Sequence, residues 1–314
     1  MKIAITCIQL IRDISMYREA LISAGLDIVL PQINGQHLEG DELIQALEGC
    51  EGVIAGDDQF TREVLSRCSD LKVISKWGIG IDGIDLAAAK ERKIKVTNTP
   101  GEFNNEVADV TMAYCVMLLR HLHQINEEVR QGNWLKPPGN SLVGKSFGIV
   151  GLGGIGLAVA DRAASFGMKI IGVDPSEQRQ KEAALKGVQI MEIDELVRSS
   201  DVISINCPLT TDTFHMFNKE LFKKMKRGAW LINVGRGGVI ETEALIEALE
   251  EQKIAGADLD VLEVEPLPKN SPLLKFKNVI FGSHNASNTF EASERVHVRS
   301  IQNLADALGI KVDV

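Results

Sequence analysis

Residues 147–174, FGIVGLGGIGLAVADRAASFGMKIIGVD, constrain the fold more than any other part of the chain. The apolar run at its start predicts a buried parallel strand over 147–150, and the helical spacing that follows predicts a helix over 155–166. A second strand is predicted over 168–173, with Asp174 at its carboxyl end. Strand, glycine turn, helix, strand and acid in this order are typical of the βαβ unit of a doubly wound sheet.

The turn contains Gly151, Gly153 and Gly156 at the spacing G-x-G-x-x-G. The first glycine allows a tight turn, the second lets backbone amides approach a pyrophosphate, and the third lets the helix pack closely. The alternative is that they serve only the turn and the helix packing. Asp174 lies where a carboxylate binds a ribose and repels a 2′-phosphate. The motif therefore predicts NAD rather than NADP, and Arg179 is too far along the chain to decide the matter.

The bulk composition narrows the class of protein. A chain of 314 residues is long for one compact core, so two domains are expected. With 45% hydrophobic and 25% charged residues, the composition is that of a globular protein. The net charge of -9 opposes binding to nucleic acid and to anionic membranes, which attract clustered cations.

Cysteine usage and hydropathy indicate a cytoplasmic protein without a metal site. The cysteines are Cys7, Cys50, Cys68, Cys115 and Cys207. They form no C-x-x-C pair and have no histidine at metal-ligand spacing, which fits a reducing compartment. Residues 1–10 are expected to form a first strand rather than an export signal. The longest other apolar stretch, 110–119, is about half as long as a bilayer requires.

Short strand-like runs alternate with helix-like runs along the whole chain. Strands are predicted over 2–6, 28–30, 52–55, 73–75 and 94–97, and after Asp174 over 189–191, 202–205, 230–233, 256–261 and 279–282. Helices such as 16–24 and 41–47 lie between the early strands. This alternation predicts parallel sheets, because parallel neighbours need a long return connection.

The order of these elements predicts an α/β protein with two doubly wound parallel-sheet domains. A Rossmann NAD-binding domain is expected over 99–289. It is inserted in a discontinuous, flavodoxin-like substrate-binding domain formed by 1–98 and 290–314. The amphipathic helix predicted over 291–308 is expected to pack back on the first domain, and another is predicted over 106–122.

Arg236, Glu265 and His284 follow predicted strands, where an open α/β sheet binds its ligands. A guanidinium suits a carboxylate, and a glutamate can orient an imidazole and stabilise its protonated form. Beside a nicotinamide this set fits hydride transfer between a 2-hydroxy acid and a 2-oxo acid. Each residue also has a structural alternative: a surface ion pair, a solvated acid, or a histidine that caps a helix.

A series of ordered stretches carries a family resemblance. They are KWGIGIDGID at 76–85, NTPGEFNNEVAD at 98–109, LVGKSFGIVGLGGIG at 142–156, CPLTTDT at 207–213, INVGRGGVI at 232–240, GADLDVLEVEP at 256–266 and SHNASNT at 283–289. Through them the chain resembles the D-isomer-specific 2-hydroxyacid dehydrogenases over nearly its whole length. The resemblance implies an NAD-dependent oxidoreductase that pairs as a homodimer through its nucleotide domain, with the helix over 106–122 as the candidate contact.

The resemblance also implies roles for individual residues. The catalytic set is Arg236, Glu265 and His284. The substrate loop is Lys76, Gly78, Ile79 and Gly80, with backbone amides at the substrate carboxylate and Asn105 nearby. The cofactor residues, besides the three glycines, are Gly154 and Ile155 at the pyrophosphate, Asp174 at the ribose, and Cys207, Thr213, Val234 and Asp260 along the rest of the dinucleotide. Cys207 is expected to contribute backbone and packing, not a reactive thiol.

The substrate is less well defined by the resemblance. The nearest group is the 3-phosphoglycerate dehydrogenases, in a short form without their regulatory C-terminal domain, and Lys76 offers one cation for a phosphate. The first expectation is therefore 3-phosphoglycerate and 3-phosphohydroxypyruvate. Glyoxylate, hydroxypyruvate or another phosphorus-containing substrate stays open, as does an NADH-sensing, corepressor-like binding protein. Gly83 and Asp109 depart from the family pattern, and so does Asn285, which adds a polar group beside His284 that can tune the substrate.

Overall fold

The chain divides into two compact units, and the computed structural model describes its residues 1–35 and 37–314. Unit 1 consists of Met1–Glu102 and Thr289–Val314, and unit 2 consists of Phe103–Asn288. The chain thus leaves unit 1, forms unit 2 and returns to unit 1 for its last helix. Each unit has its own parallel sheet.

Unit 1 is built on a five-stranded parallel sheet in the order β2-β1-β3-β4-β5. The strands are β1 (Lys2–Ile5), β2 (Asp27–Val29), β3 (Gly52–Ala55), β4 (Val73–Lys76) and β5 (Lys95–Thr97). The helices are α1 (Ile8–Asp13), η1 (Ile14–Met16), α2 (Arg18–Ser23), α3 (Gly40–Ala46), α4 (Arg62–Arg67), α5 (Leu86–Glu91) and α13 (Phe290–Leu308). This strand order is that of flavodoxin-like sheets, so the predicted fold is confirmed for unit 1.

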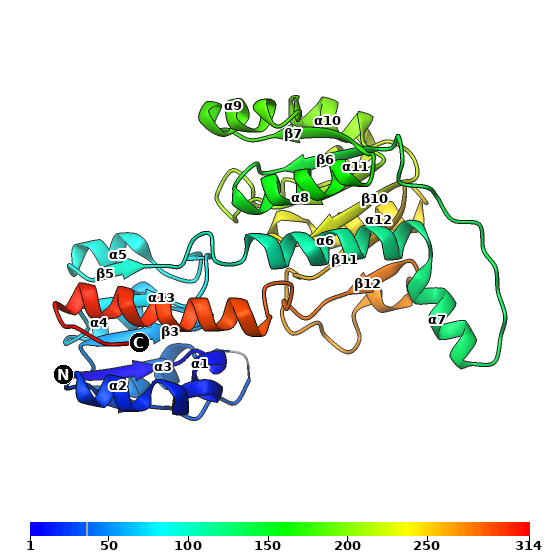
Figure 1. Cartoon of the computed structure of the whole chain (residues 1–314). Helices are drawn as coiled ribbons and strands as arrows, with labels where there is room; N and C mark the ends of the chain where they lie inside the picture. Colours follow the sequence, from blue (N-terminus) through cyan, green and yellow to red (C-terminus); the bar gives the residue numbers. More distant parts are fainter. Residues whose placement is uncertain (36) are drawn as a thin grey trace. The chain divides into compact units, whose positions relative to one another are not determined.

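The last helix, α13, covers the sheet of unit 1. It packs against β3, β4 and β5, and Figure 1 shows it in red next to β3 and β5. The side chain of Thr289 accepts a hydrogen bond from the Ala292 N–H and caps its start, and Gly309, with φ of 69°, ends it. Its buried apolar residues include Val296 and Leu304. The amphipathic pattern over 291–308 thus predicted the position of this helix correctly.

Unit 2 is built on a seven-stranded parallel sheet in the order β12-β11-β10-β9-β6-β7-β8. The strands are β6 (Ser146–Val150), β7 (Lys169–Val173), β8 (Gln189–Ile190), β9 (Val202–Ile205), β10 (Ala229–Asn233), β11 (Ile254–Leu259) and β12 (Val279–Phe281). The helices are α6 (Asn104–Leu119), α7 (Leu122–Arg130), α8 (Gly154–Ser165), α9 (Glu177–Leu185), α10 (Ile193–Ser199), α11 (Lys219–Lys224), η2 (Gly237–Val239), α12 (Thr242–Glu250) and η3 (Pro272–Lys275). The strand order reverses between β6 and β9, which is the Rossmann arrangement and confirms the predicted fold of this unit.

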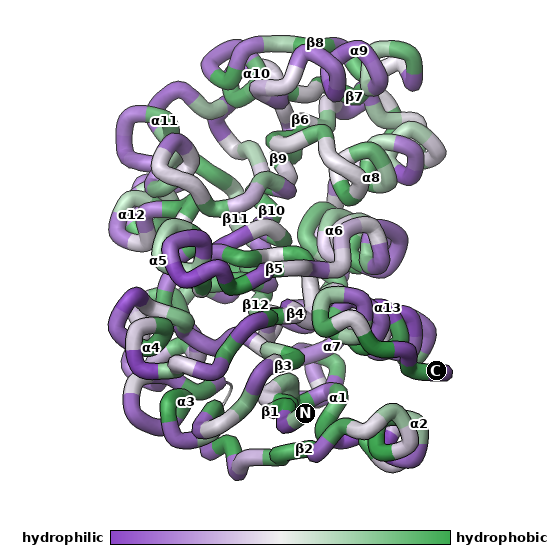
Figure 2. Tube along the Cα trace, turned by 90° about the vertical axis from the view of Figure 1, so that its left-hand side faces the viewer, coloured by the Kyte–Doolittle hydropathy of each residue, from purple (hydrophilic) through white to green (hydrophobic). Residues whose placement is uncertain are grey.

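The surroundings of the unit 2 sheet explain its apolar strands. All residues of β9 and β10 are buried, as expected for parallel strands covered on both faces. Helix α9, in contrast, is mostly hydrophilic, and Figure 2 shows much of it in purple, the colour of hydrophilic residues. None of the helices in the described part of the chain is long and apolar enough to cross a membrane.

Two predicted helices have other boundaries in the structure. The helix predicted over 106–122 ends at Leu119, and α7 begins at Leu122. Between them His121 has φ of 56°, a left-handed conformation that interrupts the helical hydrogen bonds. The helix predicted over 16–24 is present as α2, which covers Arg18–Ser23, and its first predicted residue belongs to η1.

The strand predicted over 256–261 is displaced, because β11 ends at Leu259. The next residue, Asp260, leaves the strand and turns its carboxylate toward the loop after β12. Its Oδ1 and Oδ2 accept hydrogen bonds from the N–H groups of Asn285 and Ala286, at 3.2 and 3.1 Å. Asp260, predicted as part of the strand, thus lies just beyond it and anchors the loop after β12.

Candidate active site

The glycine turn joins β6 to α8. Gly151 has φ of 95°, which glycine adopts without steric cost. A Cβ on Gly156 would lie 2.0 Å from the carbonyl oxygen of Gly151, so glycine alone lets the helix start this close to the strand. Among the described atoms, a Cβ on Gly153 would approach only Nη1 of Arg179, at 4.0 Å. The turn is closed at Gly156 and open beside Gly153.

The start of α8 fits a pyrophosphate. Gly153 precedes the helix in an extended conformation and has no side chain to cap it. The N–H groups of Gly154 and Ile155 lie in the first turn, where unpaired amides and the helix dipole favour an anion. A Cβ on Gly154 would lie 2.4 Å from Nδ2 of Asn104, so α6 supports the turn from one side. These residues are suited to hold the pyrophosphate of NAD.

Asp174 follows β7 and is 3% exposed. Its Oδ2 accepts a hydrogen bond from the Leu152 N–H at 2.8 Å, and its Oδ1 accepts one from the Ser176 N–H at 2.9 Å. The carboxylate therefore fastens the glycine turn to the end of β7, while its ribose contact stays a prediction. Nη1 of Arg179 lies 3.6 Å from Oδ2. Arg179, which by its position in the sequence was too far along the chain to decide between NAD and NADP, therefore borders this carboxylate.

Arg236 lies after β10 in a loop that packs tightly on the loop after β11. A Cβ on Gly237 would lie 1.9 Å from the carbonyl carbon of Leu262, so a glycine is needed for this approach. The side chain of Arg236 is half-buried, and its Nη1 donates to the carbonyl oxygen of Gly235 at 2.9 Å. The guanidinium is thereby held at the carboxyl end of the sheet, where such sheets bind ligands.

Glu265 and His284 form a hydrogen-bonded pair, as the sequence predicts. Nδ1 of His284 lies 3.0 Å from Oε2 of Glu265, and Oε1 of Glu265 accepts from the Leu262 N–H at 2.8 Å. The carboxylate is thus fixed on both oxygens. The His284 side chain is 34% exposed and that of Glu265 24%, so the pair is accessible to a small molecule.

The backbone around His284 is held by Asp260. The His284 N–H donates to the Asp260 carbonyl oxygen at 2.7 Å, and the Asp260 carboxylate accepts from the two residues that follow. His284 itself has φ of 55°, which is uncommon for a residue with a side chain. Asp260, predicted to contact the dinucleotide, therefore orders the histidine loop.

Three other predicted cofactor residues lie in loops at the same end of the sheet. A Cβ on Gly151 would lie 2.9 Å from the backbone nitrogen of Cys207, and the Val234 N–H donates to the Ile205 carbonyl oxygen at 3.2 Å. Thr213 closes its own loop by donating to the Pro208 carbonyl oxygen at 2.7 Å. Burial raises the pKa of the Cys207 thiol to about 11, which disfavours a reactive thiolate.

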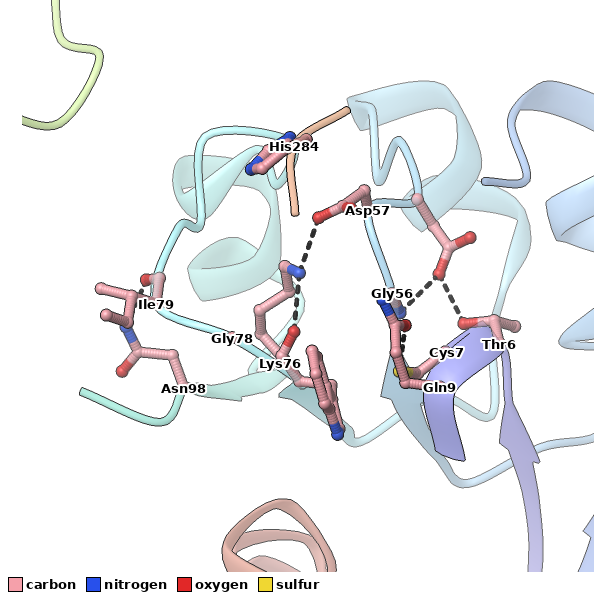
Figure 3. A network of polar contacts seen from close by, with 12 residues as sticks. Thr6, Cys7, Gln9, Gly56, Asp57, Lys76, Gly78, Ile79, Asn98 and His284 are labelled. Atoms are coloured by element: carbon pink, nitrogen blue, oxygen red, sulfur yellow. Dashed lines mark hydrogen bonds and ion pairs between the residues drawn. The ribbon is translucent and has the colours of Figure 1, made fainter. Parts of the chain in front are cut away.

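The predicted substrate loop lies in unit 1, directly after β4. Nζ of Lys76 donates to Oδ1 of Asp57 and to the Trp77 carbonyl oxygen, both at 2.9 Å, and Figure 3 shows these contacts. Gly78, with φ of 124°, donates its N–H to Oγ1 of Thr99 at 3.1 Å. The N–H groups of Ile79 and Gly80, in contrast, have no acceptor within the described residues.

Asn105 lies on the exposed side of α6, where its Oδ1 accepts from Nη2 of Arg162 at 3.2 Å. Asp109 pairs with the same guanidinium at 2.6 Å, so these side chains link α6 to α8. Asn104, which the sequence did not single out, is the asparagine that borders the glycine turn. Spacing alone could not indicate which of two adjacent asparagines would face it.

Of the residues that the structure describes, no three or more form a metal-binding group.

Comparison with known proteins identifies the family. The family model for the D-isomer specific 2-hydroxyacid dehydrogenase, NAD binding domain, matches residues 112–286. The matched region contains the glycine turn, Asp174, and the pair of Glu265 and His284. The chain belongs to the D-isomer-specific 2-hydroxyacid dehydrogenase family.

Individual members show how far the similarity extends. A glyoxylate reductase from Thermofilum pendens is 38% identical over 296 residues, which are 92% of this chain and 87% of that protein. A D-3-phosphoglycerate dehydrogenase from Methanocaldococcus jannaschii is 38% identical over 261 residues, 82% of this chain and 49% of that protein. The crystal structure of D-lactate dehydrogenase from Aquifex aeolicus with NAD and lactic acid has a TM-score of 0.88 at 30% identity, covering 98% of this chain and 96% of that one.

Family membership confirms the reaction class and the cofactor. The protein is an NAD-dependent dehydrogenase of D-2-hydroxy acids, and unit 2 contains its NAD-binding domain. The names of its relatives give several different substrates. The choice among these substrates depends on the residues of this chain.

Proposed function

We propose that the protein reduces a short 2-oxo acid, glyoxylate or hydroxypyruvate, with NADH. The proposal depends chiefly on the hydrogen-bonded pair of His284 and Glu265, 3.0 Å apart at the carboxyl end of the unit 2 sheet. A histidine oriented by a carboxylate is suited to transfer one proton in each turnover. Bound NADH supplies the hydride that reduces the carbonyl carbon.

In this proposal each member of the predicted set has one role. His284 places Nδ1 beside Glu265, and in this proposal its Nε2 donates a proton to the carbonyl oxygen of the 2-oxo acid. Glu265 orients the imidazole through the hydrogen bond to Nδ1. Arg236 binds the substrate carboxylate with its fork of donors, a geometry that lysine cannot reproduce.

The loop of unit 1 supplies the second contact to the carboxylate. The N–H groups of Ile79 and Gly80 are the donors that this loop can offer, because Gly78 uses its N–H on Thr99. A contact between Asn105 and the substrate stays a prediction. In the structure its side chain accepts a hydrogen bond from Arg162.

Lys76 is the reason for preferring an unphosphorylated substrate over 3-phosphohydroxypyruvate. Its ammonium was the one cation expected to meet a phosphate, but it pairs with Asp57, whose side chain is 61% exposed. A carboxylate at that position repels a phosphate dianion. The second candidate, 3-phosphohydroxypyruvate, requires the phosphate to find other cations.

The test compares kcat/KM for hydroxypyruvate and 3-phosphohydroxypyruvate. We expect the wild-type protein to favour hydroxypyruvate. Asp57→Asn removes one repulsive charge and should shift the ratio toward the phosphorylated acid by about tenfold, which corresponds to ~1.4 kcal/mol. Asp70→Asn, an exposed change elsewhere in unit 1, is the control and should leave the ratio unchanged. Preference of the wild-type protein for the phosphorylated acid would reverse the choice of substrate.

We also propose that two copies of the chain form a homodimer through α6. A groove beside this helix exposes a mainly apolar surface of unit 2. It is lined by Asp109, Met112, Ala113, Val116, Met117, Leu122, Arg162 and Phe166. Apolar surface rimmed by charged residues is characteristic of protein contacts.

A cytoplasmic location is a further part of the proposal. Its support is that Cys7, Cys50, Cys68, Cys115 and Cys207 are all buried and unpaired, as in proteins of reducing compartments. Fractionation of cells that express the protein tests it, and recovery with a membrane or an exported fraction would contradict it.

A further inference from the structure

The substrate loop of unit 1 is joined to the last helix by two buried side chains. Trp77 is 6% exposed, and His297 of α13 is 2% exposed. Nε1 of the Trp77 indole lies 2.9 Å from Nδ1 of His297. An indole N–H only donates, so Nδ1 is the acceptor and the imidazole carries its proton on Nε2.

Asp13 fixes the other side of the imidazole. Nε2 of His297 lies 3.2 Å from Oδ2 of Asp13. The hydrogen bond from Arg12 lowers the pKa of Asp13 to about 2, so this acceptor is charged. Burial lowers the pKa of His297, although Asp13 opposes this, and a neutral imidazole keeps a lone pair for Trp77. The hydrogen bonds thus run one way: Trp77 donates to His297, and His297 donates to Asp13.

The same helix contacts the neighbourhood of the loop at two more points. Oγ of Ser75 in β4 donates to the Ser300 carbonyl oxygen at 2.8 Å. Nδ2 of Asn303 donates to the Asn98 carbonyl oxygen at 2.9 Å. Asn98 in turn donates from Nδ2 to the Ile79 carbonyl oxygen at 2.7 Å, and Figure 3 shows these two residues side by side.

His297, Ser300 and Asn303 recur every three residues, which places them on one side of the helix. His297 contacts the first residue of the loop, Ser300 contacts the strand before the loop, and Asn303 contacts the asparagine that holds Ile79. We propose that this stripe of α13 positions the loop 77–80 for the substrate carboxylate, with His297 as a positioning residue. The inference rests on the proposed function, because that function makes the Ile79 and Gly80 amides the carboxylate donors.

The geometry also suggests why the position matters. The loop is anchored at two residues, Trp77 through His297 and Ile79 through Asn98, and the two available N–H groups lie at Ile79 and Gly80. A small displacement of the loop changes the angle and distance of two donors together. Substrate binding is sensitive to such displacements, since catalysis requires the reacting groups in one geometry.

Three variants separate positioning from simple packing. His297→Asn places an amide oxygen near the position of Nδ1 and keeps an acceptor for Trp77. His297→Gln places its amide near the position of Nε2 and removes that acceptor. Trp77→Phe removes the donor with little change in shape, and it also serves if His297→Gln does not fold.

Two measurements are made on each variant of the full chain: hydrogen–deuterium exchange of the peptide that contains 77–80, and steady-state kinetics. We expect His297→Gln and Trp77→Phe to speed exchange in this peptide and to raise KM for the 2-oxo acid about tenfold, or ~1.4 kcal/mol, as for a lost buried hydrogen bond. The Kd of NADH should change by less than about twofold, which is a much smaller effect than the tenfold rise in KM. His297→Asn should restore the slower exchange.

Several results would overturn the inference. They are unchanged loop exchange in His297→Gln and Trp77→Phe, equal loosening in His297→Asn and His297→Gln, faster exchange with an unchanged KM, or a parallel rise of KM and of the Kd for NADH. If the loop loosens as expected but the wild-type protein reduces no 2-oxo acid, the proposed function fails while the contact between α13 and the loop is supported.

Discussion

His284 combines an uncommon backbone conformation with a specific side-chain contact. Its φ of 55° is costly for most residues, and the hydrogen bond of its N–H to Asp260 helps to maintain it. Nδ1 of the same residue lies 3.0 Å from Oε2 of Glu265. Such local strain clusters at functional sites, which agrees with the proton-transfer role proposed for this histidine.

The variant His284→Asn tests that role, because asparagine tolerates a left-handed conformation and should preserve the loop. We expect kcat to fall about 10²–10⁴-fold, the usual contribution of a general acid or base. The Kd of NADH should not change. Steady-state kinetics and fluorescence titration with NADH measure the two quantities, and an equal loss in both would indicate a folding defect instead.

Asp258 of β11 is a buried acid without a role in the proposed reaction. It is 0% exposed, and neither carboxylate oxygen has a hydrogen-bond partner among the described residues. Burial raises its pKa well above the usual value, and Asp260 adds to this shift. The folded protein therefore keeps a proton on Asp258 that the unfolded chain releases above about pH 4.

Asp258→Asn should consequently change how stability depends on pH. In the wild-type protein this group lowers the free energy of unfolding as pH rises from about 4 toward the folded-state pKa. The variant lacks this loss, so its gain in Tm over the wild-type protein should be larger at pH 7 than at pH 4. Each kcal/mol corresponds to about 2–4 °C in a domain of this size. A Tm difference that is independent of pH would contradict the raised pKa.

Single residues also show where sequence analysis reaches its limit. Glu265 and His284 were predicted as a pair because their roles are chemical and both follow strands. The contact between Trp77 and His297 joins residues 220 positions apart, and no local pattern predicts it. The same holds for the Asp174 carboxylate, whose hydrogen bond to the Leu152 N–H depends on the shape of the turn.

At the scale of elements, Gly153 and Gly156 have different roles in the turn and helix that follow β6. A Cβ at Gly156 would collide with the Gly151 carbonyl oxygen, whereas one at Gly153 would enter open space beside the start of α8. Gly156→Ala should therefore lower Tm. Gly153→Ala should leave Tm nearly unchanged and weaken NADH binding more than about tenfold, because its methyl group occupies the space of the pyrophosphate.

Thermal unfolding and NADH titration of both variants measure this separation of roles. Gly187→Ala, in a left-handed position (φ 84°) outside the turn, should lower Tm through backbone strain but leave NADH affinity unchanged, so it controls for an effect of lost stability on binding. Unchanged NADH affinity in Gly153→Ala would show that the pyrophosphate does not lie at this turn.

The elements themselves were largely predictable, whereas their ends were not. Apolar runs of four to six residues predict buried strands well, since parallel strands covered on both faces need them. The end of α6 depends on the left-handed His121, and the end of β11 depends on the side chain of Asp260. Both are set by tertiary contacts that periodicity does not contain.

At the scale of the whole molecule, the proposed dimer depends on the groove beside α6. Ala113 lies in this groove and is exposed, so Ala113→Glu adds a charge there without disturbing the core. We expect the wild-type protein to sediment as a dimer and this variant as a monomer. Ala87→Glu, a change at another exposed alanine, on α5, should remain dimeric. A wild-type protein that sediments as a monomer would contradict the proposed dimer.

The central claim is that the unit 2 site, supplied with NADH, reduces a 2-oxo acid to a D-2-hydroxy acid. The most direct test incubates the wild-type protein with NADH and hydroxypyruvate and identifies the product by chiral chromatography. The account predicts D-glycerate in a one-to-one ratio to the NADH oxidised. Binding of NADH without turnover of glyoxylate, hydroxypyruvate or 3-phosphohydroxypyruvate would contradict it and favour an NADH-sensing binding protein.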